Sequence, residues 1–442
     1  MLNTDTIAAM ATPPGTGALA VLRISGPEAT EVLQRCTGGR MPEPRRATLV
    51  RVRDAEGRVL DEAVATWFAA PASFTGEDVV ELSCHGGMLV SRRVLERVLA
   101  CGARPAEAGE FSRRAFENGR MDLTQAEAVM DIISAGSDLA LRAAQSQLQG
   151  AIRHRVEEIA EKLISVTAHV EAYIDFPEED ISPDTMQQLT AGLDEAAEAL
   201  NRLLATADEG RILREGIRTA IIGAPNVGKS SLLNMLLGYE RAIVSNTAGT
   251  TRDTIEESVT VGGLCLRLID TAGLHHSEDA LERAGMERSR RAGAEADLLL
   301  VVADASAPRA ELPLDENGAH RLDILNKADL QEHSDWADSP ALRLSCRTGQ
   351  GREQLEKAIE SLFLHQRAET DSPAAINLRH RHALQSALDA TLRAREAILA
   401  GVSPEFVSVE LREALEGVGA ITGRIDTEDI LDHVFSTFCL GK

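Results

Sequence analysis

Apolar and polar residues alternate over short runs in the first part of the chain. These runs occupy residues 18–24, 47–53, 63–68 and 79–83, and they are separated by Pro13-Pro14-Gly15 and Gly86-Gly87. Alternation bounded by proline and glycine predicts strands and turns. We therefore expect residues 1–118 to form a compact α+β domain with one or two helices.

From Thr124 the apolar period becomes helical, and it continues to about residue 173. Thr124 and Glu127 have the spacing of a capping box at the start of this region. Residues 177–183 break the pattern, and Ser182-Pro183 predicts the start of another helix that runs to about residue 211. Amphipathic segments at 377–399, 404–415 and 427–438 predict further helices, which we expect to pack against the earlier ones.

Between residues 216 and 364 predicted strands and helices alternate, which is typical of a parallel α/β unit. Because the two ends of a domain commonly lie close together, such a unit can be inserted into another domain. We predict an α+β domain at 1–118, an all-α helical domain in two parts at 119–214 and 366–442, and an inserted α/β P-loop GTPase domain at 215–365.

The bulk composition limits the possible functions. The first residues resemble neither a secretory signal nor a transit peptide, and the longest apolar run, 298–303, is far shorter than a membrane span, so we expect a cytoplasmic protein. The six cysteines show no CxxC spacing, which predicts reduced thiols. Residues 121–215 hold 19 acidic against 7 basic side chains, which argues against a nucleic-acid-binding face there. A solubilising helix face is favoured over a docking surface for a basic partner.

The octapeptide Gly-Ala-Pro-Asn-Val-Gly-Lys-Ser at 223–230 fits the pattern G-x-x-x-x-G-K-[ST]. It follows a predicted strand at 219–222 and precedes a predicted helix, as the mechanism of a P-loop requires. In such a loop the backbone amides surround the phosphates, Lys229 reaches the β and γ oxygens, and the Ser230 hydroxyl binds magnesium. The segment predicts a nucleotide phosphate site.

Two later segments extend the phosphate site. Asp270-Thr271-Ala272-Gly273 follows a predicted strand at 265–269, so Asp270 can hold magnesium through water and Gly273 can approach the γ-phosphate. Thr251 lies between the two phosphate motifs and is the expected hydroxyl ligand of a switch loop. An ordinary threonine-rich turn is the alternative for that loop.

The base is indicated by Asn326-Lys327-Ala328-Asp329, which follows a predicted strand at 321–325. The Asp329 carboxylate can accept hydrogen bonds from N1 and the exocyclic amine of guanine, groups that adenine cannot match. Ser345-Cys346-Arg347 lies where the last base loop belongs, and the Cys346 N–H could meet the guanine O6, although this tripeptide is a weak signal by itself. We predict a guanine nucleotide.

The residues assigned to GTP binding are Gly223, Asn226, Val227, Gly228, Lys229, Ser230, Ser231, Ser245, Asn246, Thr247, Ala248, Gly249, Thr250, Thr251, Asp270, Thr271, Ala272, Gly273, Asn326, Lys327, Ala328, Asp329, Ser345, Cys346 and Arg347. Magnesium is assigned to Ser230, Thr251 and Asp270.

The residue after the DTAG segment is Leu274, whose apolar side chain cannot orient the attacking water as the switch glutamine of other GTPases does. Glu282 is the best candidate for this catalytic role. Asp279 and Glu282 also have the spacing of a capping box, and the local pattern by itself slightly favours the cap.

These motifs together resemble the MnmE (TrmE) family of tRNA-modifying GTPases. The similarity extends over the whole chain: it includes 11–15, 22–26, Ser73 to Asp78, His85-Gly86-Gly87, Gly109 to Ser112, the GTPase motifs and the terminal Cys439-Leu440-Gly441-Lys442. Glycine and a terminal lysine exclude a prenylation signal at Cys439. A structural thiol remains the alternative to a modification-associated Cys439.

The resemblance implies an N-terminal folate-binding and dimerisation domain, a helical domain and an inserted GTPase domain. It implies a homodimer that acts with the flavin-containing partner MnmG, which carries FAD, to place an aminomethyl or carboxymethylaminomethyl group on carbon 5 of the wobble uridine of certain tRNAs. It also favours Glu282 as the residue that positions water.

The resemblance further implies two ligand sites. Potassium is expected at Asn226, Ser245, Thr247 and Thr250, and its charge is expected to stimulate GTP hydrolysis. Formyl- or methylene-tetrahydrofolate is expected between Arg23, Glu81, Arg120 and Lys442. The alternative is that Arg23 and Arg120 are surface charges and that Glu81 is ion-paired.

Two residues depart from the family pattern, and one function of another class remains open. His275 stands where relatives often carry arginine, and Arg120 replaces a usual lysine while keeping its charge. The alternative function is a GTP-driven ribosome-assembly switch. Such proteins commonly carry a basic RNA-binding appendage, and the sequence after residue 366 lacks a GxxG RNA clamp.

Overall fold

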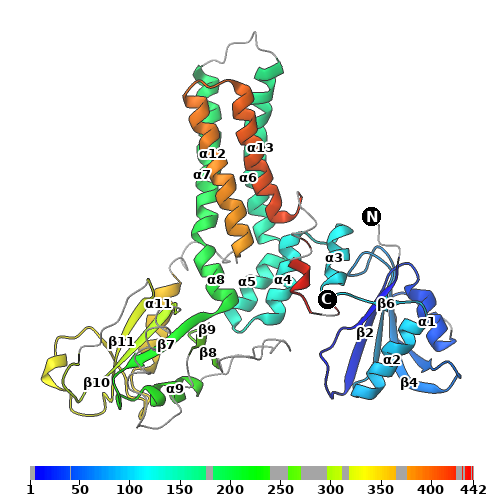
Figure 1. Ribbon diagram of the computed structural model, residues 1–442, viewed down its shortest axis with the longest axis horizontal. Helices are drawn as coiled ribbons and strands as arrows, with labels where there is room; N and C mark the ends of the chain where they lie inside the picture. The colour runs from blue at the N-terminus through cyan, green and yellow to red at the C-terminus, as the bar shows by residue number, and fades with distance from the viewer. Residues whose placement is uncertain are drawn as a thin grey trace. The chain divides into compact units, whose positions relative to one another are not determined.

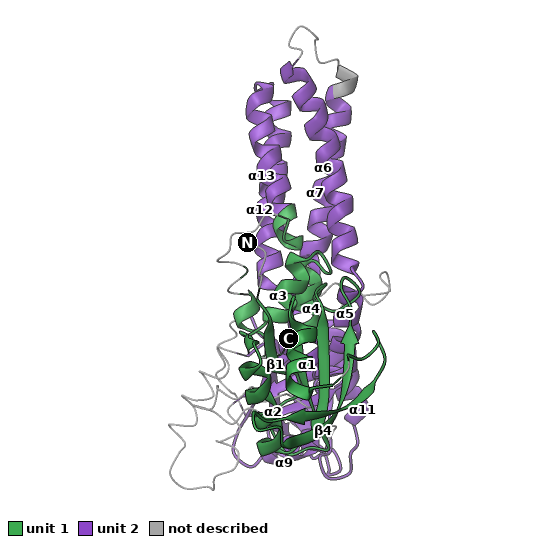
Figure 2. Cartoon of the chain, turned by 90° about the vertical axis from the view of Figure 1, so that its right-hand side faces the viewer, with its two compact units in different colours: residues 1–130, 419–442 green, residues 131–418 purple. Residues whose placement is uncertain are grey.

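The computed structural model describes residues 5–39, 41–175, 183–238, 257–269, 296–310, 318–364, 376–424, 431, 434–439 and 441. The chain divides into two compact units, which Figure 2 shows in different colours. Unit 1 comprises residues 1–130 and 419–442, and unit 2 comprises residues 131–418.

Unit 1 is built around a six-stranded sheet in the order β3-β4-β5-β2-β1-β6. Its elements are β1 (Ile7–Met10), β2 (Leu19–Ser25), α1 (Ala29–Thr37), β3 (Thr48–Arg53), β4 (Val59–Phe68), β5 (Val79–His85), α2 (Met88–Ala100), β6 (Arg104–Pro105), α3 (Glu110–Glu117) and the start of α4 (Leu123–Ser134). Neighbouring strands are antiparallel except β1 and β6.

The core of this sheet follows from the alternation in the sequence. Alternate residues of β2 and β5, such as Leu22 and Leu82, are buried in one cluster with Val32 of α1 and Val94 of α2. Burial of one face of a strand requires this period of two. The four predicted strands are therefore confirmed as β2, β3, β4 and β5, while β1 and β6 were not predicted.

Unit 2 contains the helices α5 (Asp138–Leu148), α6 (Ala151–Asp175), α7 (Pro183–Ala205), α8 (Ala207–Glu215), α12 (Leu378–Leu399) and α13 (Pro404–Thr422). Figures 1 and 2 show α6, α7, α12 and α13 side by side. Ion pairs join the later helices to the earlier ones: Arg395 of α12 pairs with Asp194 of α7 at 2.5 Å, and Arg412 of α13 pairs with Glu171 of α6 at 3.4 Å. The expectation that the C-terminal helices pack against the earlier ones is confirmed for the segments at 377–399 and 404–415, and part of the segment at 427–438 lies outside the described residues.

The predicted capping box at Thr124 and Glu127 is wrong. The Gln125 N–H donates to Asp122 Oδ1 and the Asp122 N–H donates to Gln125 Oε1, so the reciprocal pair lies two residues earlier. Thr124 is inside α4, where its hydroxyl donates to Asp122. The predicted helical region to residue 173 consists of α4, α5 and α6, and the predicted helix to about residue 211 is divided into α7 and α8.

The rest of unit 2 is a second six-stranded sheet in the order β12-β11-β10-β7-β9-β8. Its elements are β7 (Ile217–Gly223), α9 (Lys229–Leu237), β8 (Glu257–Val261), β9 (Leu264–Leu268), β10 (Leu298–Asp304), β11 (His320–Asn326), a 3-10 turn (Ser334–Trp336), β12 (Leu342–Arg343) and α11 (Arg352–Phe363). All neighbouring strands are parallel except β8 and β9.

The order of this sheet reverses between β7 and β10, because the chain adds β9 and β8 on one side of β7 and β10, β11 and β12 on the other. Ligands of open α/β sheets bind at the carboxyl ends of the strands at such a switch point. The sheet also shares its core with the helices, since Ala143 of α5 and Ile212 and Leu213 of α8 are buried in one cluster with Ile217 of β7.

The predicted domain boundaries are not tested by this division, and they remain predictions. Residues 119–130 and 419–442 belong to the compact unit of the first sheet, although the sequence was divided at 118 and 365. Within the described part of the chain, no helix is both long enough and apolar enough to cross a membrane.

Candidate nucleotide-binding site

Two positions between the end of β7 and the start of α9 must be glycine, because atoms of β10 and β11 lie too close to allow a side chain. A Cβ on Gly223 would lie 2.3 Å from the carbonyl oxygen of Val302 on β10, and a Cβ on Gly228 would lie 2.1 Å from Nδ2 of Asn326. Gly228 also has φ of 99°, in the left-handed region, directly before the first residue of α9. No other residue type fits either position without displacing backbone or a buried amide.

Lys229 begins α9 and its side chain folds back over the loop. Its Nζ donates to the carbonyl oxygens of Gly223 at 3.0 Å and Ala224 at 2.7 Å. Burial lowers the pKa of Lys229, because the charged ammonium loses hydration. Ser230 and Ser231 follow in the first turn of the same helix. The N-terminus of a helix and a cationic side chain therefore converge on one loop, as phosphate binding requires.

Asn326, at the end of β11, joins this loop to the base loop. Its Nδ2 donates to the Val227 carbonyl at 2.9 Å, and its Oδ1 accepts from the Cys346 N–H at 3.2 Å. The residue is 3% exposed, so both polar ends of the amide are satisfied inside the protein. The Cys346 N–H, which we expected to meet guanine O6, donates to Asn326 in this structure.

Asp329 is held in place by the loop that follows β12. The Ser345 hydroxyl donates to Asp329 Oδ1 at 2.7 Å, and Arg347 Nε lies 3.7 Å from Oδ2. The Ser345 hydrogen bond is the main cause of a lowered pKa of Asp329, so the carboxylate stays ionised at neutral pH. The Ala328 N–H donates to the Leu344 carbonyl at 3.1 Å, and burial raises the pKa of the Cys346 thiol to about 11.

Several predicted site residues lie outside the described residues. They are Ser245, Asn246, Thr247, Ala248, Gly249, Thr250, Thr251, Asp270, Thr271, Ala272, Gly273, His275, Glu282 and Lys442. Their assigned roles remain predictions. Within the described ranges, no group of three or more His, Cys, Asp or Glu side chains could hold a metal ion.

In unit 1 the structure brings Arg23 and Glu81 together. They are cross-strand neighbours on β2 and β5, and Arg23 Nη2 donates to Glu81 Oε1 at 2.8 Å. The guanidinium carbon lies 5.1 Å from the centre of the Phe74 ring and 5.7 Å from that of Phe111. The expected alternative of an ion-paired Glu81 is thus observed, with Arg23 as its partner.

The C-terminal tail reaches the same strands. Arg23 Nη1 donates to the Gly441 carbonyl at 3.5 Å, and a Cβ on Gly441 would lie 2.3 Å from the carbonyl oxygen of Met10 on β1. Cys439, two residues before Gly441 in the sequence, is half-buried. The exposed Arg120 lies with its side-chain Cγ 3.2 Å from the Cβ position of Gly76, so its stem follows the loop before β5.

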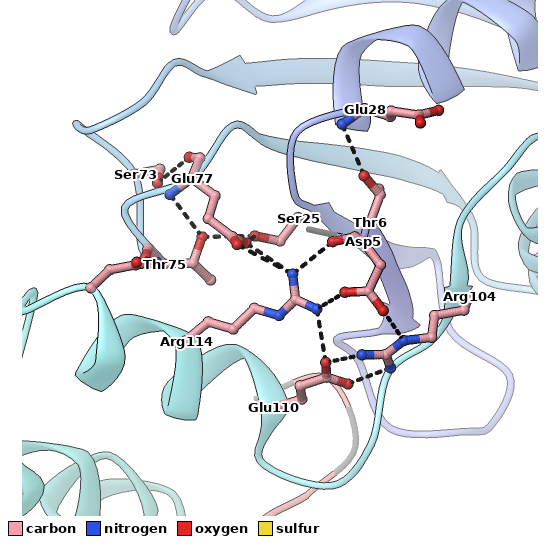
Figure 3. A network of polar contacts seen from close by, with 11 residues as sticks. Asp5, Thr6, Ser25, Glu28, Ser73, Thr75, Glu77, Arg104, Glu110 and Arg114 are labelled. Carbon is pink, nitrogen blue, oxygen red and sulfur yellow. Dashed lines mark hydrogen bonds and ion pairs between the residues drawn. The ribbon is translucent and has the colours of Figure 1, made fainter. Parts of the chain in front are cut away.

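A buried ion network beside this region was not predicted from the sequence (Figure 3). Arg114 of α3 is 1% exposed, and its guanidinium donates to Asp5 Oδ1 at 2.7 Å, Glu110 Oε1 at 2.9 Å and Glu77 Oε1 at 3.2 Å. Arg104 also pairs with Asp5 and Glu110. Glu77 and Glu110 lie in motifs of the resemblance, and the structure gives them structural partners.

Comparison with known families shows to which family the chain belongs. Residues 123–439 match the family described as MnmE helical domain, and residues 6–120 match the family described as GTP-binding protein TrmE N-terminus. A protein of Akkermansia muciniphila named tRNA modification GTPase MnmE is 60% identical over 443 residues, covering 99% of each chain. The chain belongs to the MnmE family of tRNA modification GTPases.

Two further MnmE relatives have the same name and the same full-length match. The protein of Opitutus terrae is 45% identical over 450 residues, and that of Geobacter sulfurreducens is 44% identical over 453 residues. In both cases 99% of this chain and 99% of the relative are covered. The match to these relatives therefore extends over both units of the chain.

Proposed function

We propose that this protein binds and hydrolyses GTP and that, with a flavin-containing MnmG partner, it modifies carbon 5 of the wobble uridine of certain tRNAs. The group added is aminomethyl or carboxymethylaminomethyl. Membership of the MnmE family supports the tRNA reaction. The observation that carries the nucleotide assignment is that Lys229, Asn326 and Asp329 lie at the carboxyl ends of parallel strands of one sheet, with Asn326 bonded to the phosphate loop that contains Lys229.

Guanine recognition rests on Asp329. Its ionised carboxylate has one oxygen fixed by Ser345 and accepts only, so it complements the N1–H and the amino group of guanine. During binding, the Cys346 N–H is shared between Asn326 Oδ1 and the guanine O6, because its present bond of 3.2 Å is long.

The base assignment is tested by Asp329→Asn. The new amide can donate to the position-2 carbonyl of xanthine and no longer accepts from the guanine amine, so the variant should prefer xanthine nucleotides. Binding of GDP and XDP is measured by calorimetry. Asp323→Asn, which changes an exposed carboxylate on β11, is the matched control. An Asp329 variant that keeps the wild-type preference for GDP would contradict the assignment.

Hydrolysis in this proposal needs two cations. Magnesium, held by Ser230, Thr251 and Asp270, would neutralise charge on the phosphates when bound. Potassium, with Asn226 as one ligand, would supply the charge that an arginine finger supplies elsewhere, a contribution of about 10³ to 10⁵ in rate. Glu282 orients the attacking water.

The folate site is proposed at the junction of the tail and the sheet of unit 1. Arg23 and Glu81 lie side by side, the side chain of Arg23 is 14% exposed and that of Glu81 28%, and the Gly441 carbonyl contacts Arg23. A pterin-like ring of formyl- or methylene-tetrahydrofolate would donate hydrogen bonds to the Glu81 carboxylate, and its carboxylates would suit Arg120 and Lys442. The homodimer forms through this N-terminal domain.

The tRNA reaction is tested in a deletion strain. Nucleoside mass spectrometry of total tRNA should show loss of the modified wobble uridine, and the intact gene should restore it. A Lys229→Ala gene, which removes the P-loop ammonium, should fail to restore it. The ribosome-assembly alternative would instead give normal modification together with accumulated ribosomal precursors.

A further inference from the structure

Two loops of the nucleotide site contain a non-glycine residue in the left-handed region. Asn226 in the phosphate loop and Lys327 in the base loop both have φ of 63°, and among the described residues Arg45 is the only other such case. A side chain disfavours this conformation, so it persists where surrounding contacts fix it. The contacts at these two residues therefore need an explanation.

The two residues are bonded to each other. Lys327 Nζ donates to the Asn226 carbonyl at 3.0 Å and to Asp304 Oδ2 at 2.6 Å. Asp304 is the last residue of β10, the strand between the two that lead into these loops. Its other oxygen accepts from the Ser306 N–H and hydroxyl, at 2.9 Å and 2.7 Å, so the carboxylate cannot rotate without losing contacts.

Two successive peptide groups of the phosphate loop are thereby held. The Asn226 carbonyl accepts from Lys327 and the Val227 carbonyl accepts from Asn326. In a trans peptide the carbonyl and the following N–H point in opposite directions. The N–H groups of Val227 and Gly228 are therefore directed away from the base loop, and successive N–H groups arranged in this way form an anion-binding concavity.

We propose that Asp304 is a positioning residue for the nucleotide: it holds the Lys327 ammonium against the Asn226 carbonyl and so couples the base loop to the phosphate loop. The inference rests on the proposed function in that the bound ligand is a guanine nucleotide. Asp304 touches neither base nor phosphate and acts through Lys327. Without the carboxylate, the ammonium turns to solvent and Asn226 relaxes from its left-handed conformation.

The test measures dissociation constants of fluorescent methylanthraniloyl-GDP for the full-length protein. Asp304→Ala should weaken binding by about 10- to 100-fold, the range expected for loss of a hydrogen bond to a charged group. Asp304→Asn, which keeps the shape, should give a smaller loss of the same sign. Ser306→Ala removes one bond of the β10 turn but leaves Asp304 Oδ2 on Lys327, and it should bind within two-fold of wild type.

Two double variants separate positioning from general destabilisation. On a Lys327→Met background, Asp304→Ala should have no further effect on affinity, because the coupled ammonium is already absent. On an Asn226→Gly background the effect of Asp304→Ala should shrink at least three-fold, because glycine adopts the left-handed conformation without support. A purely structural role of Asp304 would give additive losses in both cases.

Additive losses, or an Asp304→Ala protein that is folded and binds as wild type does, would overturn the inference. These results leave the proposed function intact, since the wild type still binds. A wild-type protein that fails to bind methylanthraniloyl-GDP would overturn the proposed function as well. The thermal midpoint of each variant without nucleotide shows whether it is folded.

Discussion

Arg114 is the residue whose replacement should most damage unit 1. Its side chain is 1% exposed and faces three carboxylates, those of Asp5, Glu77 and Glu110. Arg114→Met keeps most of the apolar stem but leaves Asp5 and Glu110 with Arg104 as their remaining cation, and it removes the ion pair of Glu77. Removing one partner of a buried ion pair costs about 3–5 kcal/mol when the other charge stays desolvated, which here applies to Glu77 and Glu110.

The size of the effect on melting follows from the size of the unit. Unit 1 contains about 150 residues, and in a domain of this size 1 kcal/mol lowers the midpoint by about 2–4 °C. We therefore expect the midpoint of unit 1 to fall by about 6–20 °C. The matched control is Arg92→Met on α2, whose side chain is 76% exposed in its pair with Glu96 and whose loss should leave the midpoint close to that of the wild type.

The assay uses the two tryptophans of the chain, since Trp67 belongs to unit 1 and Trp336 to unit 2. On a Trp336→Phe background, tryptophan fluorescence during heating reports the unfolding of unit 1. GTP hydrolysis at 25 °C should persist in the Arg114 variant, because its predicted residues lie in unit 2. Equal midpoints for Arg114→Met and Arg92→Met would refute the reasoning.

The pH dependence gives an independent check of the same network. Hydrogen bonds and charges from Arg104 and Arg114 lower the pKa of Asp5 and Glu110 in spite of their burial. Groups with a depressed folded pKa contribute stability above their unfolded pKa of about 4, and this stability is lost as the pH falls through the folded pKa. In Arg114→Met these pKa values rise toward their unfolded values, so the difference in free energy of unfolding between wild type and variant should be constant from pH 7 to pH 5 and should narrow as the pH falls below about 4.

Three further predictions concern hydrolysis, the tail and the attachment of the second sheet. Glu282→Ala should lower GTP turnover about 10³-fold or more with little change in GTP affinity, and sodium should replace potassium poorly in the wild type, both measured by phosphate release; a fully active variant would exclude this role. Deletion of residues 439–442 should weaken formyl-tetrahydrofolate binding in calorimetry and leave GTP turnover unchanged; unchanged folate affinity would exclude a shared pocket. Asp297→Ala removes ion pairs with Arg211 and Arg218 and should lower the free energy of unfolding of unit 2 by about 1–3 kcal/mol. Trp336 fluorescence during heating should show this loss, and GDP should restore part of it. An unchanged thermal midpoint of unit 2 would contradict this prediction.

Local patterns predicted the elements that carry the nucleotide site. Of the parallel strands of unit 2, β10 is a nearly continuous apolar run, and the strands predicted at 219–222 and 321–325 match β7 and β11 to within about two residues at each end. The phosphate and base motifs follow such strands directly, which places Lys229 and Asp329 at one edge once the sheet is parallel. A motif next to a buried strand is therefore predictable from the sequence.

Contacts made by residues far apart in sequence were not predictable in this way. Asp304 belongs to no sequence motif. Its proposed role depends on the position of β10 between β7 and β11, and that position is known only from the strand order of the sheet. Asp5 and Arg114 are likewise separated by more than a hundred residues, and the sequence around each of them predicts only an exposed charge. The capping box failed for a different reason: Asp122 with Gln125 satisfies the same rule as Thr124 with Glu127, and the pattern does not rank them.

The pairing of Arg23 with Glu81 shows why a family motif does not by itself define a binding pocket. The pair is only partly exposed, and the Phe74 and Phe111 rings hold the guanidinium near Glu81. A ligand that donates hydrogen bonds to Glu81 must therefore use the carboxylate oxygen Oε2, since Oε1 accepts both Arg23 bonds. Ion pairing and folate binding are compatible on this arrangement, because Arg23 fixes the orientation of the carboxylate and leaves one oxygen outside these two bonds.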